Sequence, residues 1–376
     1  MKKVGYLGPE GTFSEEAALR YLAGGEGGIT VPYPSLDRLF EAVSRGELEE
    51  AVVPLENSCE GSVNITMDLL AEDFDLKIRG EIIVPVCQSL LVRPGTDEAD
   101  LEGIVSHPQA LGQCRNVIQK KFPALPLLEV GSTAEAARQV AGAKERWGAI
   151  GTVRAAESYG LEVLRTQIND RDDNATRFIV LGKEEKPASP DSKTSVIVSV
   201  TDRPGALYRL LKEFALKNIN LTRIESRPAK RRLGDYLFYI DFQGHRSDPG
   251  IALVLNNVAA QAAGFKILGS YPADALYQDE ARANRVESMT IEEIRADIDI
   301  IDFQIVELLG KRTELVGYLA GLKKGTKIRD ADRERKVLDR VKEIAVQKGF
   351  DTAVVEEIYK ILFRHFVELQ GAKMMS

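Results

Sequence analysis

The sequence predicts a multidomain chain in which an α/β domain, a ferredoxin-like βαββαβ domain and an all-helical domain follow one another. The 376 residues, of which 44% are hydrophobic and 28% charged, are too many for one ordinary core. Two polar stretches, KEEKPASPDSKTS at 183–195 and QDEARANRVES at 278–288, have the composition of linkers. The hydrophobic pattern also differs between the three segments that they separate. We therefore expect domains at 1–182, 194–276 and 287–376.

Composition and charge exclude several classes of function. The formal net charge of −7 and the pI near 5.4 disfavour binding to nucleic acid or to an anionic membrane, since both need a basic surface. The N-terminal stretch MKKVGYLGPEG fits neither a signal peptide nor a membrane span, so we expect a cytoplasmic protein. The three cysteines are widely spaced without a CxxC pair, which indicates reduced thiols. The three histidines lie in different regions, so we expect no histidine-rich metal site.

In the first segment, short apolar strands such as KVGYLG and RFIVLG alternate with helical stretches such as SEEAALRYL, which predicts an α/β domain with a largely parallel sheet. Polar stretches stand at the strand ends, where ligand groups gather in open α/β folds. Taken singly, several have a structural explanation, with Thr12 or Ser14, and Ser132 or Thr133, as helix caps and His107 as a hydrogen-bonded structural residue. The five stretches are GPEGTFSEEAA (8–18), PLENSCEGSV (54–63), SHPQALGQC (106–114), GSTAEAA (131–137) and NDRDDNATRF (169–178).

The second segment alternates in the order strand, helix, strand, strand, helix, strand, from SVIVSV through ALYRLLKEFALKN to KILGSYP. This order is that of a ferredoxin-like module. Pro204 and Gly205 open its first helix, where free backbone NH groups can receive a ligand carboxylate.

From Ile291 onward, apolar residues recur at steps of three and four, which predicts helices at about 290–323, 332–348 and 352–371. Arg312 lies within the apolar stripe of the first helix, and Lys323 points the same way about three turns later. Cations that face a helical core are costly unless an anion meets them, so a site for a small dianion is favoured over pairing with local acids such as Asp302 or Glu307. Arg295 is rotated by about a quarter turn and would reach another surface, such as the pocket of a neighbouring subunit.

Residues 287–376 resemble the all-helical chorismate mutase family through IRADIDIID, GKR, the position of Lys323, IRDADRE and ELQ. The resemblance implies a dimer that lends one arginine across the subunit boundary, and a unimolecular rearrangement that needs positioning and electrostatics but no acid, base or cofactor. It also implies the residue roles. Arg295, Arg312 and Arg333 would bind the carboxylates of chorismate, Lys323 and Gln370 would stabilise the ether oxygen, and Asp330 and Glu334 would bind a substrate hydroxyl or orient the arginines. Phe366 departs from the family, which commonly has a small hydroxyl residue there.

The polar stretches of the first segment, in their order, resemble the prephenate dehydratase family over nearly all of 1–182, with TRF (176–178) as its signature. The resemblance implies two α/β lobes with a cleft between them, like periplasmic binding proteins. It places Thr176 at the leaving hydroxyl and Arg177 at a substrate carboxylate, although Thr176 could instead cap the strand entry. A threonine hydroxyl is a poor acid, so we expect it to act by hydrogen bonding. The resemblance also implies that Glu56, Asn57, Ser106 and Gln113 line the cleft.

The stretches TDRPGALYRLLKEFA and TRIESRP resemble the ACT regulatory module of the same enzymes. The alternative is a structural spacer. The resemblance implies an L-phenylalanine site between paired domains, formed by Gly205, Ala206, Leu207, Glu225, Ser226, Arg227 and Pro228.

These resemblances together predict a bifunctional enzyme without a metal or cofactor, which converts chorismate to prephenate and prephenate to phenylpyruvate, CO2 and water. L-phenylalanine would inhibit it by feedback, and a homodimer or a dimer of dimers is expected, with no nucleic-acid or membrane partner. Three alternatives stay open: a prephenate dehydratase with a non-catalytic helical dimerisation domain, an arogenate dehydratase, and a non-enzymatic ligand sensor.

Overall fold

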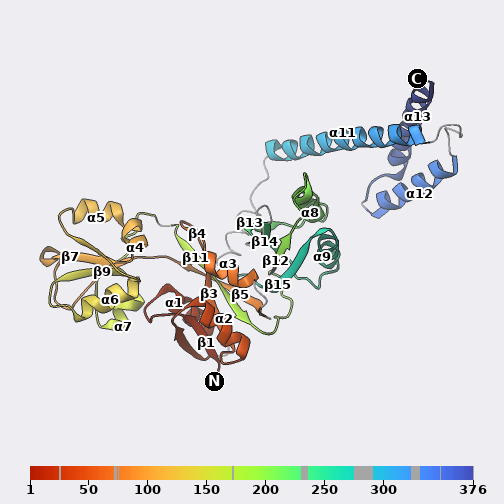
Figure 1. Ribbon diagram of the computed structural model, residues 1–376. Helices are drawn as coiled ribbons and strands as arrows, with labels where there is room; N and C mark the ends of the chain where they lie inside the picture. The colour runs from red at the N-terminus through yellow and green to blue at the C-terminus, as the bar shows by residue number, and fades with distance from the viewer. Residues whose placement is uncertain are drawn as a thin grey trace. The chain divides into compact units, whose positions relative to one another are not determined.

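The computed structural model describes residues 1–24, 27–71, 74, 76–171, 173–229, 236–274, 291–322, 331–347 and 349–375 (Figure 1). The chain divides into two compact units, Met1–Asn284 and Arg285–Ser376. Within the described residues, no helix has the length and apolar character needed to cross a membrane.

The first lobe of the first unit is a six-stranded sheet in the order β2-β1-β3-β11-β5, with β4 paired to β3. Residues Ala51–Val53 and Ile179–Leu181 are fully buried, which explains their unbroken apolar runs in the two central strands. The strands are β1 (Lys3–Leu7), β2 (Ile29–Tyr33), β3 (Glu50–Asn57), β4 (Gly61–Ser62), β5 (Lys77–Pro85) and β11 (Ala175–Gly182), and the helices are α1 (Phe13–Ala23), α2 (Leu36–Arg45) and α3 (Asn64–Ala71).

The second lobe is a five-stranded sheet in the order β10-β6-β9-β7-β8. Its strands are β6 (Ser89–Val92), β7 (Gly103–Ser106), β8 (Leu127–Glu129), β9 (Trp147–Gly151) and β10 (Glu162–Arg165). Its helices are α4 (Pro108–Gln113), α5 (Arg115–Lys121), α6 (Thr133–Gly142) and α7 (Val153–Tyr159), with a 3-10 turn η1 (Glu98–Asp100). The two sheets confirm the predicted two-lobed α/β domain.

Both sheets are mixed, so the prediction of a largely parallel sheet is wrong. Strand β1 pairs in parallel with β2 and β3, but β11 pairs antiparallel with β3 and β5. In the second lobe, β7 has parallel neighbours and β6 antiparallel ones. The cause is the path of the chain, which leaves the first lobe after β5 and returns as β11. These two crossings join the lobes and bring residues 169–178 between them.

Two predicted capping residues and one predicted structural histidine lie where the sequence places them. The Thr12 hydroxyl accepts from the backbone N–H of Glu15 at 3.3 Å, and the Ser132 hydroxyl accepts from that of Glu135 at 3.0 Å. His107 caps α4, since its Nδ1 accepts from the backbone N–H of Gln109 at 3.3 Å. The structural interpretation of these residues is confirmed.

The ferredoxin-like domain is a four-stranded antiparallel sheet in the order β13-β14-β12-β15, which confirms the predicted βαββαβ order. Val196 and Val198 face its helices, whereas Ile197 belongs to the core of the first lobe, because side chains alternate along a strand. Tyr239 and Tyr271 join that core too, so the sheet is covered on both faces. The elements are β12 (Ser192–Ser199), α8 (Ala206–Ala215), β13 (Leu221–Pro228), β14 (Tyr236–Gln243), α9 (Pro249–Gln261) and β15 (Gly264–Pro272).

The second unit consists of α11 (Ile291–Leu322), α12 (Ala331–Gln347) and α13 (Thr352–Met375), as predicted. Helix α13 contacts both of the others. Large apolar side chains on α11 remain exposed within the chain, among them Phe303, Leu315 and Tyr318 at 67% or more. The helical unit by itself therefore leaves part of the apolar stripe of α11 uncovered.

Candidate active site

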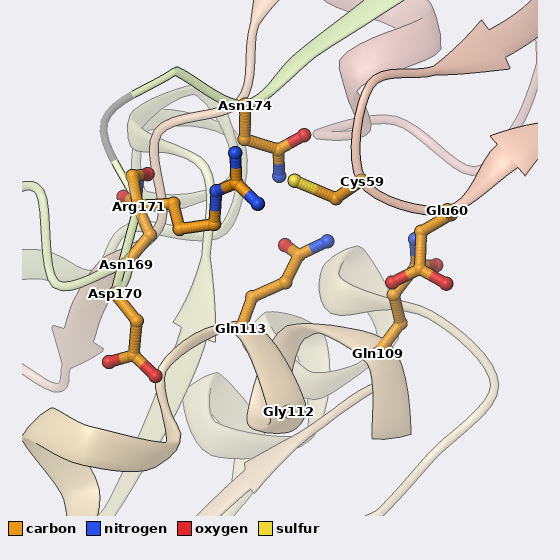
Figure 2. A pocket seen from close by; sticks show the side chains of 9 residues that line it. All are labelled: Cys59, Glu60, Gln109, Gly112, Gln113, Asn169, Asp170, Arg171 and Asn174. Carbon is orange, nitrogen blue, oxygen red and sulfur yellow. The ribbon is translucent and has the colours of Figure 1, made fainter.

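A pocket of about 320 Å³ lies between the two lobes, and three segments form it (Figure 2). These are the turn between β3 and β4, helix α4 and the returning segment before β11. The side chains that line it are polar. They are Cys59, Glu60, Gln109, Gln113, Asn169, Asp170, Arg171 and Asn174, together with the backbone of Gly112.

Four side chains point toward a common space in this pocket. Figure 2 shows the guanidinium of Arg171, the amides of Gln113 and Asn174 and the thiol of Cys59 directed inward. Arg171 also pairs with Asp173, with Nε to Oδ1 at 2.9 Å and Nη2 to Oδ2 at 2.8 Å. Both partners are exposed, so this pair is weakly held. The lining also contains the carboxylates of Glu60 and Asp170, and Asp170 accepts from the backbone N–H of Asn116 at 3.1 Å. The space among the Arg171 cation, the amides of Gln113 and Asn174 and the Cys59 thiol is therefore the part of the pocket that suits a small anionic ligand.

Thr176 is next to the pocket and is fixed by Asn57, its cross-strand partner. The Asn57 amide donates to the Thr176 hydroxyl oxygen and to Asn174 Oδ1, each at 2.9 Å. Asn57 Oδ1 in turn accepts from the backbone N–H groups of Cys59 and Glu60, which fixes the orientation of the amide. Because the Thr176 oxygen accepts a hydrogen bond, its own proton can be donated to another acceptor. Asn57, Thr176 and the pocket residue Asn174 are therefore brought together.

Arg177 lies elsewhere, and its predicted contact with a substrate carboxylate is wrong in this structure. It is 8% exposed and donates to Glu81 at 2.7 Å, to Asp241 at 2.7 Å and to the Tyr271 hydroxyl at 3.0 Å. Burial alone would lower the pKa of Arg177, but the nearby Asp241, Tyr271, Glu81 and Glu56 hold it well above its ordinary value. Successive residues of a strand face opposite sides, so Thr176 and Arg177 cannot both face the pocket.

Glu56 and Ser106 also differ from expectation. Glu56 is the cross-strand partner of Arg177, accepts from it at 3.0 Å and pairs with Arg223 of β13 at 2.8 Å. Ser106 is fully buried, and its hydroxyl donates to the backbone oxygen of Ile150 at 2.6 Å. Neither side chain lines the pocket, whereas Gln113 does and accepts from Gln88 at 3.2 Å.

The ferredoxin-like domain places two of its predicted ligand residues against the first lobe. Glu225 accepts from Ser62, and Arg227 donates to Asn64 and Asp68. These side chains are therefore engaged within the chain and are not directed to a ligand. Gly205 is the N-cap of α8 with a φ of 76°, a conformation that favours glycine. Ala206, Leu207, Ser226 and Pro228 remain predictions.

In the helical unit, aromatic rings surround Arg312. Its guanidinium carbon lies 5.0 Å from the ring centre of Phe366 and 5.4 Å from that of Tyr359. Phe366, which departs from the family pattern, is buried. Arg295 and Arg333 are exposed and Glu334 is half-buried. Lys323 and Asp330 lie outside the described residues, as does the side chain of Gln370.

Sequence reasoning missed Arg171 and Asn174 although both belong to NDRDDNATRF, the stretch singled out for its polarity. Their place in the pocket depends on the position of this stretch at the crossing between the lobes. That position follows from the order of the strands in the sheets and has no local signal in the sequence. It also missed Cys59 and Glu60, whose place in the pocket follows from the hairpin of β3 and β4.

Comparison with known proteins identifies the three domains. Sequence profiles of prephenate dehydratase, the ACT domain and chorismate mutase type II match residues 4–186, 194–260 and 294–371. A bifunctional chorismate mutase/prephenate dehydratase of Pseudomonas aeruginosa is 42% identical over 276 residues, which are 73% of this chain and 74% of the relative.

Two solved structures have a similar fold. Prephenate dehydratase from Arthrobacter aurescens, in complex with L-Phe, is 32% identical with a TM-score of 0.67, over 81% of this chain and 99% of that one. A protein described as a novel type of quorum-quenching acylase is 31% identical with a TM-score of 0.67, over 73% of this chain and 100% of that one. Since one fold carries both names, the activity has to be argued from the residues of the site. The sequence relationship nevertheless places this chain in the prephenate dehydratase family, with an ACT domain and a chorismate mutase type II domain in the same polypeptide.

Proposed function

We propose that the chain catalyses two consecutive reactions of phenylalanine biosynthesis. The helical domain rearranges chorismate to prephenate, and the α/β domain converts prephenate to phenylpyruvate, CO2 and water. We also propose domain limits of 1–182, 194–276 and 287–376, and a cytoplasmic location. The observation that carries it is the Thr176 hydroxyl, fixed by Asn57 beside a polar pocket that contains Arg171.

In the dehydratase reaction, the bond between the ring and its carboxylate breaks to release CO2 and its electrons enter the ring. The hydroxyl group of the opposite ring carbon leaves as water, with one proton taken up from the solvent. Thr176 donates its hydroxyl proton as a hydrogen bond to the leaving oxygen while Asn57 holds the threonine in place. Arg171 binds the side-chain carboxylate that stays in the product. A cation on the departing carboxylate would stabilise the reactant more than neutral CO2 and so oppose the reaction.

For the mutase, Arg312 is the central cation for a chorismate carboxylate, since two aromatic rings hold it without neutralising it. Arg295, Arg333, Lys323, Gln370, Asp330 and Glu334 keep the roles that the family resemblance implies. The exposed apolar side chains of α11 support a homodimer, because a second copy would cover them and could receive Arg295.

L-phenylalanine is the proposed effector of the ACT domain. A structurally similar prephenate dehydratase has been solved with L-Phe. In this chain the N-terminus of α8 at Gly205 offers backbone N–H groups to the carboxylate of the amino acid. Ala206, Leu207, Ser226 and Pro228 complete the proposed site.

The test is to incubate the purified chain with chorismate and, separately, with prephenate, and to quantify prephenate and phenylpyruvate. Thr176→Val removes the hydroxyl at nearly constant volume and should abolish phenylpyruvate formation while leaving chorismate consumption intact. Arg312→Gln should do the reverse. Thr176→Ser is the matched control that keeps a hydroxyl, and it should keep most of the activity.

The dehydratase pocket is tested separately with Arg171→Gln, which should raise the KM for prephenate. Arg146→Gln removes an exposed ion pair of the second lobe with Asp100 and serves as the control. Consumption of prephenate but not of chorismate by the native chain would reduce the helical domain to a dimerisation element. Binding of prephenate without turnover would favour the ligand sensor.

A further inference from the structure

One strand of the ACT domain contacts both strands of the β3–β4 hairpin. Arg223 of β13 pairs with Glu56 of β3 at 2.8 Å and donates to the Ser62 hydroxyl of β4 at 2.8 Å. Glu225, two residues further along β13, accepts from the same hydroxyl. Glu56 and Ser62 are cross-strand partners, so β13 contacts the hairpin at a single cross-strand pair.

The next cross-strand pair of the same hairpin lies beside the dehydratase pocket. Asn57 pairs with Gly61, and the turn between them carries Cys59 and Glu60, which line the pocket. Asn57 is also the residue that fixes the Thr176 hydroxyl. Since neighbouring residues of a strand face opposite sides, one displacement of β3 moves Glu56 on the ACT side and Asn57 on the pocket side together.

The adjacent strand β11 repeats this arrangement. Thr176 faces Asn57, while Arg177 on the other face binds Glu56 of the hairpin and Asp241 of the ACT strand β14. Asp241 is 3% exposed, and burial of this kind makes a charge pair sensitive to small changes of geometry. Both residues of the contact between Asn57 and Thr176 are thus next in sequence to residues of an interdomain charge cluster.

We propose that Glu56 is a positioning residue for dehydration, and that the β3–β4 hairpin is the route by which the ACT domain controls the Thr176 hydroxyl. This inference rests on the proposed dehydratase and its L-phenylalanine effector. Strand β13 continues from Arg223 into Ser226 and Pro228, which belong to the proposed effector site. An effector that prefers one position of β13 therefore also prefers one position of the hairpin, which is the condition for allosteric control.

Glu56→Gln tests this role because it removes the charge and keeps the size. We expect kcat for prephenate to fall while KM stays within about twofold, the pattern of a lost transition-state contact. The coupling to L-phenylalanine, commonly about 5- to 150-fold, should fall toward one. The mutase activity of the same chain should not change, and thermal unfolding of the first unit, measured in parallel, controls for its folding. If Glu56 instead bound substrate, KM would rise and the response to L-phenylalanine would remain.

Arg223→Gln removes the same link from the ACT side, and Lys266→Gln is its matched control. Lys266 of β15 donates to the backbone oxygen of Leu70 at 3.0 Å, so it joins the same two domains through α3. Both variants lose an interdomain contact, but only Arg223→Gln should lose the response of the dehydratase to L-phenylalanine. Equal loss in the two variants would mean that general docking carries the effect and would overturn the proposal.

Hydrogen exchange gives a readout that does not depend on turnover. In the native chain, L-phenylalanine should change exchange in peptides that cover 55–62 and 173–178, and Arg223→Gln should abolish this change. Unchanged exchange in the native chain, or an unaltered response in Arg223→Gln, would refute the coupling. A chain that shows this response but does not consume prephenate would refute the dehydratase assignment alone.

Discussion

The aromatic surroundings of Arg312 lead to a prediction that separates two interpretations of Phe366. Either Phe366 supports Arg312 as a carboxylate-binding cation, or its bulk obstructs the mutase pocket, where the family commonly has a small residue. The Phe366 ring lies 5.0 Å from the Arg312 guanidinium and Tyr359 lies 5.4 Å from it. A cation–π contact contributes about 0.5–2 kcal/mol, so removing one of the two rings should cost about 1 kcal/mol. In a rate this corresponds to a decrease of about fivefold.

The perturbation is Phe366→Leu, which keeps an apolar side chain at this buried position and so limits the loss of stability. The assay is kcat/KM for chorismate, with thermal unfolding of the helical unit measured in parallel. Phe363→Leu is the control, since the Phe363 ring packs on Tyr359 of the same helix at 5.9 Å. A lower kcat/KM in Phe366→Leu but not in Phe363→Leu supports the aromatic support of Arg312. An increase would show that Phe366 obstructs the pocket and would refute this reasoning.

Three further predictions concern the first unit. A Cβ at Gly269 of β15 would clash with the backbone of β5, so Gly269→Ala should lower the free energy of unfolding by about 1–3 kcal/mol. Chemical denaturation measures this loss. Gly250→Ala, which adds a Cβ in open space, is the control and should not lower the free energy of unfolding. Burial would raise the pKa of Asp241, but nearby cations hold it below its ordinary value of 3.8. Because the unfolded state then binds more protons than the folded state, this contribution to stability is present above pH 3.8 and decreases below it. Asp241→Asn should flatten that decrease in acid titrations of unfolding, and an unchanged slope would contradict the assignment. Prephenate should protect Cys59, which lines the pocket, from alkylation followed by mass spectrometry, while the exposed Cys87 reacts at the same rate with or without it.

The elements of the fold could be predicted from the sequence because they depend on local periodicity. The three helices after Ile291 and the βαββαβ order of the middle domain follow from runs of a single period. The direction of the strands could not be predicted in this way. The apolar run of β11 reads the same whether it pairs with β10, which precedes it, or with β3, more than a hundred residues earlier. Its return to the first lobe makes the sheets mixed and creates the crossing where the pocket lies.

For the site residues, too, what local sequence indicates differs from what only the tertiary structure shows. Gln113, which the family resemblance implies for the cleft, lines the pocket, and Asn57 meets Thr176 through a cross-strand pair. Arg177 could not be placed from TRF alone, because a motif of consecutive residues does not tell which of them faces the pocket. Its partner Asp241 belongs to another domain, and a local sequence pattern does not predict an ion pair between residues 64 positions apart.

Arg171 in the pocket and Arg177 behind it differ in the free energy needed to release them from their partners, and this difference favours Arg171 as the residue that binds substrate. Arg177 would have to leave Glu81 and Asp241, and breaking a buried pair leaves an uncompensated buried charge. Arg171 is 68% exposed and its partner Asp173 69%, so water replaces the carboxylate at little cost and a substrate carboxylate can do the same. Asp173 is then a competitor of prephenate for Arg171. Asp173→Asn should lower the KM for prephenate with kcat unchanged in steady-state assays, and a higher KM would show that Asp173 orients Arg171 for binding.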